Sequence, residues 1–265
     1  EEYASDNIKN IYNSFDNVQI DSAKIGDRIM GLPGTANDFG PNLVWIRQDW
    51  LDDLDVQLDE DGNHAITLEE LESTAKTFKD KDAGGTGKTQ GLAFANWLTS
   101  DSHGGSGYTA TAIFNAFDSF PKNYLVGEDG QLVYGSNTAK TKEGLSYVKQ
   151  LFDDGILDDQ FGTRTYDDIN AMMINGELGI IPGPWHLSDW ALVQAKTANP
   201  DAAFTPYAIE SSDGQVNGVS KPGVGGYVVV NKNFANPELA IKIINLLFDE
   251  VPNSTDMETE YPEIY

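Results

Sequence analysis

Residues 174–185 have the sequence INGELGIIPGPW, in which a helix end, a short strand and an aromatic turn follow one another. Asn175-Gly176 suits the left-handed end of a helix that starts at Thr165 and turns Met172 and Met173 towards the core. The apolar run 179–181 predicts a strand. A Pro-Gly-Pro turn then presents Trp185. Helix followed by strand is the repeating unit of α/β proteins.

Three further helices are expected from capping signals and from apolar residues at helical spacing. Thr67 and Glu70 form a capping box, and Asn236-Pro237 is a cap followed by proline at the first helical position. The expected helices are 67–78, 142–152 and the segment from Asn236 to Leu247.

Short apolar runs between these helices predict strands. Their alternation with helices predicts α/β layers with a largely parallel sheet. A hairpin centred on Gly127 and Asp129-Gly130 is expected as an insertion at 124–134. The predicted strands are 43–46, 91–95, 179–181, 204–209 and 224–230.

The charge balance of the 265 residues excludes several functions. Lys and Arg number 17 against 42 Asp and Glu, a net charge of −25. Phosphate backbones and anionic lipid surfaces repel such a chain. The sequence has no apolar run long enough to span a bilayer as a helix, and no cysteine for a disulfide, a thiol nucleophile or a Cys-ligated metal. Glu1-Glu2-Tyr3 carries no leader, so any export signal is expected upstream.

Two glycine-rich loops are candidates for ion binding. Residues 82–89 lack the glycine spacing and the leading strand of a phosphate-binding loop. Calcium is the alternative, with Asp80, Asp82 and Gln90 as candidate ligands, but Gly84 and Thr86 stand where further acidic ligands belong. A plain turn is the competing interpretation. Residues 59–63 begin like an EF-hand and lack its final glutamate. No cofactor is predicted.

Catalytic motifs are incomplete. In 103–108, Tyr108 stands where a serine-hydrolase elbow needs glycine. His64, His103 and His186 are far apart and lack metal-ligand spacing. A carboxylate pair for glycoside hydrolysis is not identifiable from sequence among so many acids, so a glycan-active enzyme stays open.

Aromatic residues follow two of the predicted strands. Asn96-Trp97 comes after the strand at 91–95, and Trp185-His186 after the one at 179–181. Ligands of open α/β sheets bind at the carboxyl ends of strands, and sugars suit pockets that pair aromatic planes with hydrogen-bonding groups. Trp45, Trp50 and Trp190 lie inside predicted elements and are assigned to the core or the lobe surface.

From Lys24 onward the chain resembles the extracellular solute-binding proteins of sugar ABC importers, the maltose-binding-protein-like group with many Gram-positive lipoproteins. The segments that carry the resemblance occur in the family's order. They are Ile29-Met30-Gly31-Leu32-Pro33, Leu43-Val44-Trp45-Ile46-Arg47-Gln48-Asp49-Trp50-Leu51, Thr67-Leu68-Glu69-Glu70-Leu71, residues 174–185, and Val224-Gly225-Gly226-Tyr227-Val228-Val229-Val230-Asn231-Lys232 with Asn236-Pro237-Glu238-Leu239-Ala240.

The resemblance implies a type II periplasmic-binding-protein fold that lacks the N-terminal part of a full member. Residues 35–222 are then one nearly complete lobe, while 1–34 and 223–265 supply hinge segments and part of the other. The acidic tail from Asp249 is expected to wrap a surface or to be poorly ordered. By resemblance the ring of Trp185 stacks on sugar, beside Asn96 and Trp97. The predicted ligand-binding set is Trp185, Trp97, Asn96, His186, Asn37, Asp38, Gly226 and Tyr227.

The function expected from the resemblance is non-catalytic binding of an oligosaccharide outside the cell, for import through an ABC permease. Lipid anchoring of the intact protein is part of that expectation. The alternatives are a glycan-active enzyme, a binding protein for another polar solute such as a peptide, and an adhesion or scaffold domain on the same fold.

Overall fold

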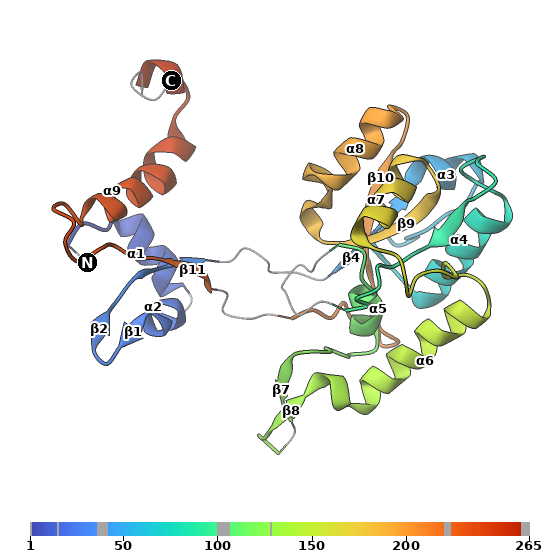
Figure 1. Cartoon of the computed structure of the whole chain (residues 1–265), viewed down its shortest axis with the longest axis horizontal. Coiled ribbons are helices and arrows are strands. Elements are labelled where there is room, and N and C mark those ends of the chain that lie inside the picture. The colour runs from blue at the N-terminus through green and yellow to red at the C-terminus, as the bar shows by residue number, and fades with distance from the viewer. Residues whose placement is uncertain are drawn as a thin grey trace. The chain divides into compact units, whose positions relative to one another are not determined.

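The computed structural model describes residues 2–14, 16–35, 42–99, 107–127, 129–219 and 224–260. The chain divides into two units (Figure 1). Unit 1 comprises Glu1–Asp38 with Lys221–Tyr265, and unit 2 comprises Phe39–Ser220. The predicted α/β class is confirmed.

A five-stranded mixed sheet forms the centre of unit 2. The strands lie in the order β5 (Ala65–Ile66), β10 (Phe204–Ile209), β4 (Leu43–Arg47), β9 (Leu178–Gly183) and β6 (Gln90–Leu92). β4 is antiparallel to both of its neighbours, whereas β5 with β10 and β6 with β9 are parallel pairs. The expectation of a largely parallel sheet is therefore wrong.

The position of β4 explains the mixed sheet. β9 and β10 run in the same direction on either side of β4, and α8 (Ala191–Ala198) connects them along the chain. β4 is the first strand of the unit in sequence and runs in the opposite direction between them. A short apolar run predicts a buried strand of either direction, so strand direction was not encoded in the pattern.

Both faces of the sheet are buried. Val44 and Ile46 belong to one hydrophobic cluster, whereas Trp45 between them belongs to a second. α4 (Leu68–Asp80) packs on β6 and β9, and α7 (Tyr166–Ile174) packs on β9 and α8. Burial on both faces explains why the strands are continuously apolar instead of alternating.

Two glycines allow α4 to approach the sheet closely. A Cβ at Gly91 would lie 1.9 Å from the carbonyl oxygen of Ala75, and one at Gly179 would lie 2.3 Å from the ring of Phe78. Both contacts are far shorter than van der Waals distance. Glycine at these two positions therefore sets the spacing between the helix and strands β6 and β9.

The capping signals located the helices of unit 2 well. Thr67 forms the predicted capping box with Glu70, and the helix predicted to start at Thr165 does so with a second capping box that uses Asp168. Met172 and Met173 are buried, as predicted. α6 (Ala139–Asp153) starts before residue 142, because the Thr138 hydroxyl accepts a hydrogen bond from the Thr141 amide at 3.2 Å.

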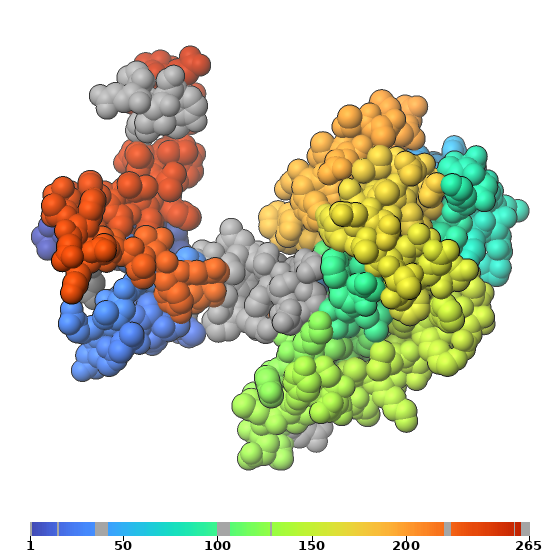
Figure 2. All heavy atoms as spheres, in the orientation of Figure 1, coloured from blue at the N-terminus to red at the C-terminus, as the bar shows by residue number. Residues whose placement is uncertain are grey.

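The remaining elements of unit 2 are short. The predicted hairpin is confirmed: β7 (Tyr124–Val126) pairs with β8 (Leu132–Tyr134), and it protrudes from the rest of the unit (Figures 1 and 2). The predicted strand 91–95 ends at Leu92, although residues 93–95 are also buried. The other elements are α3 (Gln48–Asp53), α5 (Thr111–Ala116), η1 (Gly135–Asn137) and η2 (Trp185–Asp189).

Unit 1 has a two-stranded sheet, in which β3 (Leu32–Thr35) is antiparallel to β11 (Val224–Val228). Many of its large apolar side chains are exposed, among them Ile29 and Phe248, and a cavity of about 700 Å³ lies beside the sheet. The other elements are α1 (Asp6–Asn13), α2 (Val18–Ser22), β1 (Lys24–Ile25), β2 (Arg28–Ile29), α9 (Leu239–Asn245), η3 (Leu246–Glu250), η4 (Val251–Asn253) and α10 (Met257–Glu260).

The start of the last helix differs from its prediction. α9 begins at Leu239, and Asn236 does not cap it. The amide of Leu239 instead donates to the Asn236 carbonyl at 3.1 Å, which closes a turn over Pro237 and Glu238. The apolar face of α9 is not buried within the described residues.

Candidate functional site

The turn after β9 is anchored at both of its sides. All six residues of β9 are buried, and Pro184 then leads the chain out of the sheet. The indole Nε1 of Trp45 donates to the Pro184 carbonyl at 3.1 Å, and the Tyr108 amide donates to the Pro182 carbonyl at 2.7 Å. With its backbone fixed in this way, Trp185 stays 48% exposed.

A second loop starts where β6 ends. The amide of Ala95 donates to the Tyr108 carbonyl at 2.7 Å, and that of Asn96 donates to the Arg164 carbonyl at 2.9 Å. Trp97 is 39% exposed. Because β6 and β9 are parallel neighbours, their carboxyl ends lie at the same edge of the sheet. The loops that carry Trp97 and Trp185 therefore leave the sheet at the same edge, where α/β proteins bind ligands.

A row of aromatic side chains links the two exposed tryptophans. We call it the aromatic strip, and it consists of Trp97, Tyr166, Trp190, His186 and Trp185. The Tyr166 ring lies 6.4 Å from that of Trp97 and 5.8 Å from that of Trp190, centroid to centroid, and its plane is nearly parallel to that of Trp190, at 11°. His186 lies 6.4 Å from Trp190 and 5.1 Å from Trp185.

Tyr108 lies beneath the strip and supports it. Its ring is fully buried, 4.9 Å from that of Tyr166. Its hydroxyl donates to the Asn170 amide oxygen at 3.1 Å. Burial raises the pKa of Tyr108 far above its ordinary value, and the neighbouring Tyr166 adds to the shift. Burial also raises the pKa of Tyr166, helped by the Asp167 carboxylate. Both phenols are protonated at neutral pH.

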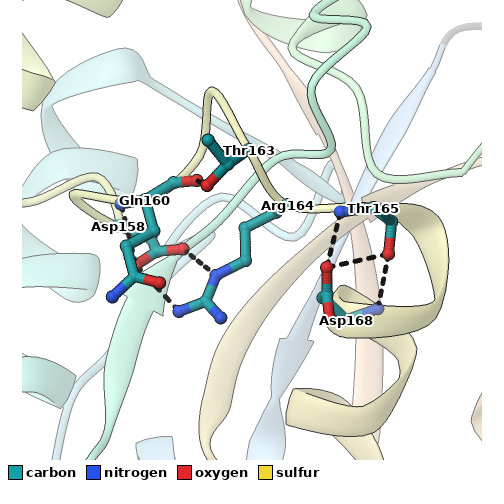
Figure 3. A network of polar contacts seen from close by, with 6 residues as sticks. All are labelled: Asp158, Gln160, Thr163, Arg164, Thr165 and Asp168. Atoms are coloured by element: carbon teal, nitrogen blue, oxygen red, sulfur yellow. Dashed lines mark hydrogen bonds and ion pairs between the residues drawn. The ribbon is translucent and has the colours of Figure 1, made fainter.

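A buried ion pair holds the segment before Tyr166 (Figure 3). The Arg164 Nε donates to Asp158 Oδ2 at 2.6 Å, and Nη2 donates to Oδ1 at 3.3 Å. The Asp158 side chain is completely buried and the Arg164 side chain is 24% exposed. This hydrogen bonding to Asp158 raises the pKa of Arg164. The ion pair therefore fixes the position of the Arg164 backbone carbonyl, which accepts the hydrogen bond from the Asn96 amide.

The structure brings four of the predicted ligand-binding residues to one region of unit 2. Trp185 and His186 belong to the strip, and so does Trp97, which Asn96 precedes. Gly226 and Tyr227 lie on β11 of unit 1, where the Tyr227 hydroxyl bonds the Ser22 hydroxyl at 3.0 Å. Asn37 and Asp38 lie outside the described residues, as does His103.

Sequence reasoning missed part of the strip. Trp45 and Trp50 are buried, as expected, but Trp190 is half-buried and stacks on Tyr166. Tyr166 was not singled out at all. The sequence feature that could have identified Tyr166 is its position directly after the Thr165 cap, at the first residue of a helix.

The calcium candidates do not fit the ion. Asp82 uses one carboxylate oxygen to accept from the Thr89 hydroxyl at 2.5 Å and the other to accept from the Gly87 amide at 2.9 Å. These bonds lower the pKa of Asp82, the Thr89 bond most. Asp80 is paired with Lys76, and Gln90 starts β6 with a buried, unbonded Oε1. Across the described ranges there is no group of three His, Cys, Asp or Glu side chains that could hold a metal.

A polar cavity lies at the other end of β4 from the strip. It measures about 560 Å³, and Arg47, Asp49 and Asp201 are among its lining residues. The Arg47 guanidinium is held by the Asp49 carboxylate, at 2.8 Å from Nε, and stacks over Trp50 at 4.5 Å. Its charge is therefore already compensated.

Fold and strip together define a class of protein: an α/β domain that exposes a row of aromatic side chains where its strands end. Residues 12–251 match the family of bacterial extracellular solute-binding proteins, and the chain belongs to that family. Among the described residues, the helices are all too short or too polar to cross a membrane.

Several proteins are similar to the chain. Lipoprotein LipO of Bacillus subtilis is 25% identical over 87% of this chain and 44% of its own length. The polygalacturonan/rhamnogalacturonan-binding protein YtcQ of the same organism is 25% identical over 78% and 39%. The Streptococcus pneumoniae substrate-binding protein FusA in complex with kestose superposes with a TM-score of 0.60 at 18% identity, over 93% and 49%. The chain thus spans about half the length of these relatives or less.

Proposed function

We propose that the chain binds an oligosaccharide without transforming it, as the solute-binding component of an ABC importer. The observation that carries this proposal is the aromatic strip, with its two exposed tryptophans at the edge of the sheet. Sugar rings present flat faces of C–H groups, which stack on indole, and a rim of hydroxyls, which need hydrogen-bonding partners. Asn96 and His186 lie beside the tryptophans and supply such partners.

The magnitude of the stacking term is sufficient for specific binding. Burying roughly 100 Å² of an exposed indole contributes about 2.5 kcal/mol at about 25 cal/mol per Å². Two such rings add up to about 5 kcal/mol before the cost of immobilising the ligand, and hydrogen bonds to hydroxyls add to that.

Three relatives support the sugar class by their names. YtcQ is named as a polygalacturonan/rhamnogalacturonan-binding protein, and FusA as a fructooligosaccharide ABC transporter substrate-binding protein. A solved structure of an HMO-binding, ABC-transporter-associated solute-binding protein from Bifidobacterium longum infantis has a TM-score of 0.61 at 17% identity. From these names we carry over the partner as well, an ABC permease in the membrane.

We further propose that residues 35–222 act as one nearly complete lobe and that 1–34 and 223–265 are hinge segments and part of a second lobe. The exposed apolar side chains of unit 1 and its cavity of about 700 Å³ support this, because they are what a partly assembled core leaves open. The further ligand residues that we propose are Asn37 and Asp38, at the start of the lobe, and Gly226 and Tyr227, in the segment 223–265.

The proposed location is the outer face of the cell membrane, with the intact protein held there by a lipid. The family description places its members outside the cell, and the name of LipO supports the anchor. Export of the protein and labelling of the anchor with a radioactive fatty acid test this part separately.

The proposal is tested by titrating the chain calorimetrically with a panel of oligosaccharides and analysing each mixture for products after prolonged incubation. Saturable heat with the sugar recovered intact supports binding for transport. Cleavage of the sugar contradicts the non-catalytic assignment, and heat with oligopeptides alone contradicts the sugar class.

A further inference from the structure

Exposed carboxylates stand next to residues of the aromatic strip, whereas the Lys122 ammonium near the Trp97 loop donates to the Thr99 carbonyl at 2.9 Å. Asp167 and Asp168 follow Tyr166 directly and are exposed, and Asp189 precedes Trp190 and is exposed as well. Asp168 is used in the capping box of α7, and the bonds from Thr165 lower its pKa, so it is ionised at neutral pH. The whole sequence adds a net charge of −25 to this local field.

Arg164 is the cation nearest in sequence to Tyr166, and its charge is already neutralised by the Asp158 carboxylate. The hydrogen bond from its Nε to Asp158 Oδ2, at 2.6 Å, is short enough to be strong, and the Asp158 side chain has no access to water. Turning Arg164 towards a ligand would leave a buried carboxylate unpaired, which is strongly unfavourable. In Figure 3 the Arg164 side chain reaches Asp158 and lies apart from the Thr165–Asp168 capping box.

A carboxylate on a sugar needs a cation or several hydrogen-bond donors, which the acidic residues beside the strip do not supply. When a uronate enters a site it loses water, and only a cation or several donors can compensate for that loss. Here it would meet Asp167 and Asp189 instead, so Coulomb repulsion adds to the desolvation penalty.

An uncharged sugar meets a suitable surface. The Tyr166 hydroxyl is protonated and can donate to a sugar oxygen, because burial and the Asp167 carboxylate raise its pKa. Carboxylate oxygens at the rim of the strip can accept from sugar hydroxyls, an interaction that negative charge strengthens. The flat rings of Trp97 and Trp185 need no charge on the ligand.

We propose that the aromatic strip selects uncharged oligosaccharides and rejects uronate-containing ones, since Arg164 beside it is neutralised by buried Asp158 and the exposed side chains of Asp167 and Asp189 next to it are acidic. This inference rests on the proposed sugar-binding function and narrows it. The names of the relatives include both kinds of ligand, because polygalacturonan is a polyanion and a fructooligosaccharide is neutral.

The test compares matched charged and uncharged ligands by calorimetry on the whole chain. Gluco-, galacto- and fructo-oligosaccharides are titrated beside oligouronates of equal length, and oligogalacturonate is also compared with its fully methyl-esterified form. We expect the uncharged sugars to bind at least about tenfold more tightly. Raising the salt from about 50 to about 300 mM should strengthen any residual uronate binding, because salt screens repulsion.

The outcomes separate this inference from the function on which it rests. Tighter binding of uronates, weakened by salt, would overturn the inference and leave sugar binding intact. Absence of binding by every sugar, charged or not, would reject the proposed function and this inference with it.

A charge reversal locates the selectivity. Asp167→Lys places a cation beside Tyr166 and should lower the preference for uncharged over uronate ligands roughly twofold to fivefold. Glu60→Lys makes the same change of charge in the exposed turn before β5, at the far edge of the sheet, and should leave the preference unchanged. Equal shifts in both variants would assign the selectivity to net charge and overturn its assignment to the strip.

Discussion

The indole of Trp45 donates a hydrogen bond of 3.1 Å to the carbonyl oxygen of Pro184, the residue immediately before the exposed Trp185. Trp45 lies in the middle of β4 and is buried in the same cluster as Met172 and Ile181. The core of the sheet thus fixes the backbone from which the proposed sugar-stacking ring extends. Core packing and binding geometry are connected through one bond.

Replacing Trp45 by phenylalanine is expected to weaken sugar binding about fivefold. The variant retains an aromatic ring in the core but loses a bond worth about 1 kcal/mol, so the Pro184 turn loosens. Trp50→Phe is the matched control, because Trp50 is equally buried in the other cluster and has no bond to the turn. Calorimetry should show weaker binding in the first variant alone. Equal weakening in both would mean that loss of stability, and not the turn, is responsible.

Trp185→Ala is expected to weaken sugar binding roughly 10- to 100-fold, at about 1.4 kcal/mol per decade. Since the ring is 48% exposed, the stability of the fold should change by less than about 1 kcal/mol. Trp185→Phe should retain part of the affinity, and Leu145→Ala, an exposed apolar residue of α6, should retain all of it. Unchanged affinity in a folded Trp185→Ala protein would remove this ring from the site.

Arg164→Gln is expected to destabilise unit 2 by about 3–5 kcal/mol, because it leaves the buried Asp158 carboxylate unpaired. The double variant Asp158→Asn/Arg164→Gln removes both charges and should recover a large part of that loss. Urea unfolding followed by circular dichroism measures both. A single variant as stable as the double one would show that the pair does not hold the loop.

Acid stability is expected to depend on Asp168. Hydrogen bonds from the Thr165 amide and hydroxyl, both at 2.8 Å, lower its folded-state pKa. A group with a depressed folded pKa contributes stability that is fully present above its unfolded value, near pH 4, and is lost as the pH falls through the folded value. Asp168→Asn should therefore flatten the decline of the melting temperature below about pH 4. Asp53→Asn, an exposed carboxylate of α3 outside any capping box, should leave that decline as it is in the parent chain. If the melting temperature of Asp168→Asn declined below about pH 4 as it does in the parent chain, the capping carboxylate would not contribute to acid stability.

The loop at 82–89 is expected to hold its shape without calcium. The Asp82 carboxylate already accepts hydrogen bonds from the Thr89 hydroxyl and the Gly87 amide. Adding calcium or a chelator should therefore shift the melting temperature by less than about 1 °C. Thr89→Val should cost about 1 kcal/mol, because the buried hydroxyl bond to Asp82 is lost. A melting temperature that rises with calcium concentration would restore the metal site.

Short local sequence signals predicted where helices begin, whereas the strand directions in the sheet depend on long-range pairing and were predicted wrongly. The capping box at Thr67 and the helix start at Thr165 each depend on a few neighbouring residues, so both were predictable from the sequence. The direction of β4 depends on which strands flank it, and apolar runs carry no record of that. Asn236-Pro237 had the signature of a helix start but closed a turn instead, because the cap bond was not made.

The candidate site was predictable only where its residues follow strand ends. Trp97 and Trp185 lie within a few residues of the ends of apolar runs, so the rule that ligands bind at strand ends singled them out. Tyr166 and Trp190 stack at 5.8 Å although they belong to different elements, and no spacing in the sequence reports such a contact. The burial of Asp158 was likewise hidden among 42 acidic residues.

The central claim is that exposed tryptophans of the strip stack on an oligosaccharide. Intrinsic tryptophan fluorescence of the chain and of its Trp185→Ala and Trp97→Ala variants, titrated with the same oligosaccharides, tests this most directly. We predict a saturable change in the parent chain, with its amplitude reduced and its midpoint shifted about tenfold or more in each variant. A saturable change that persists unaltered in both variants, or no change with any oligosaccharide, would contradict the claim.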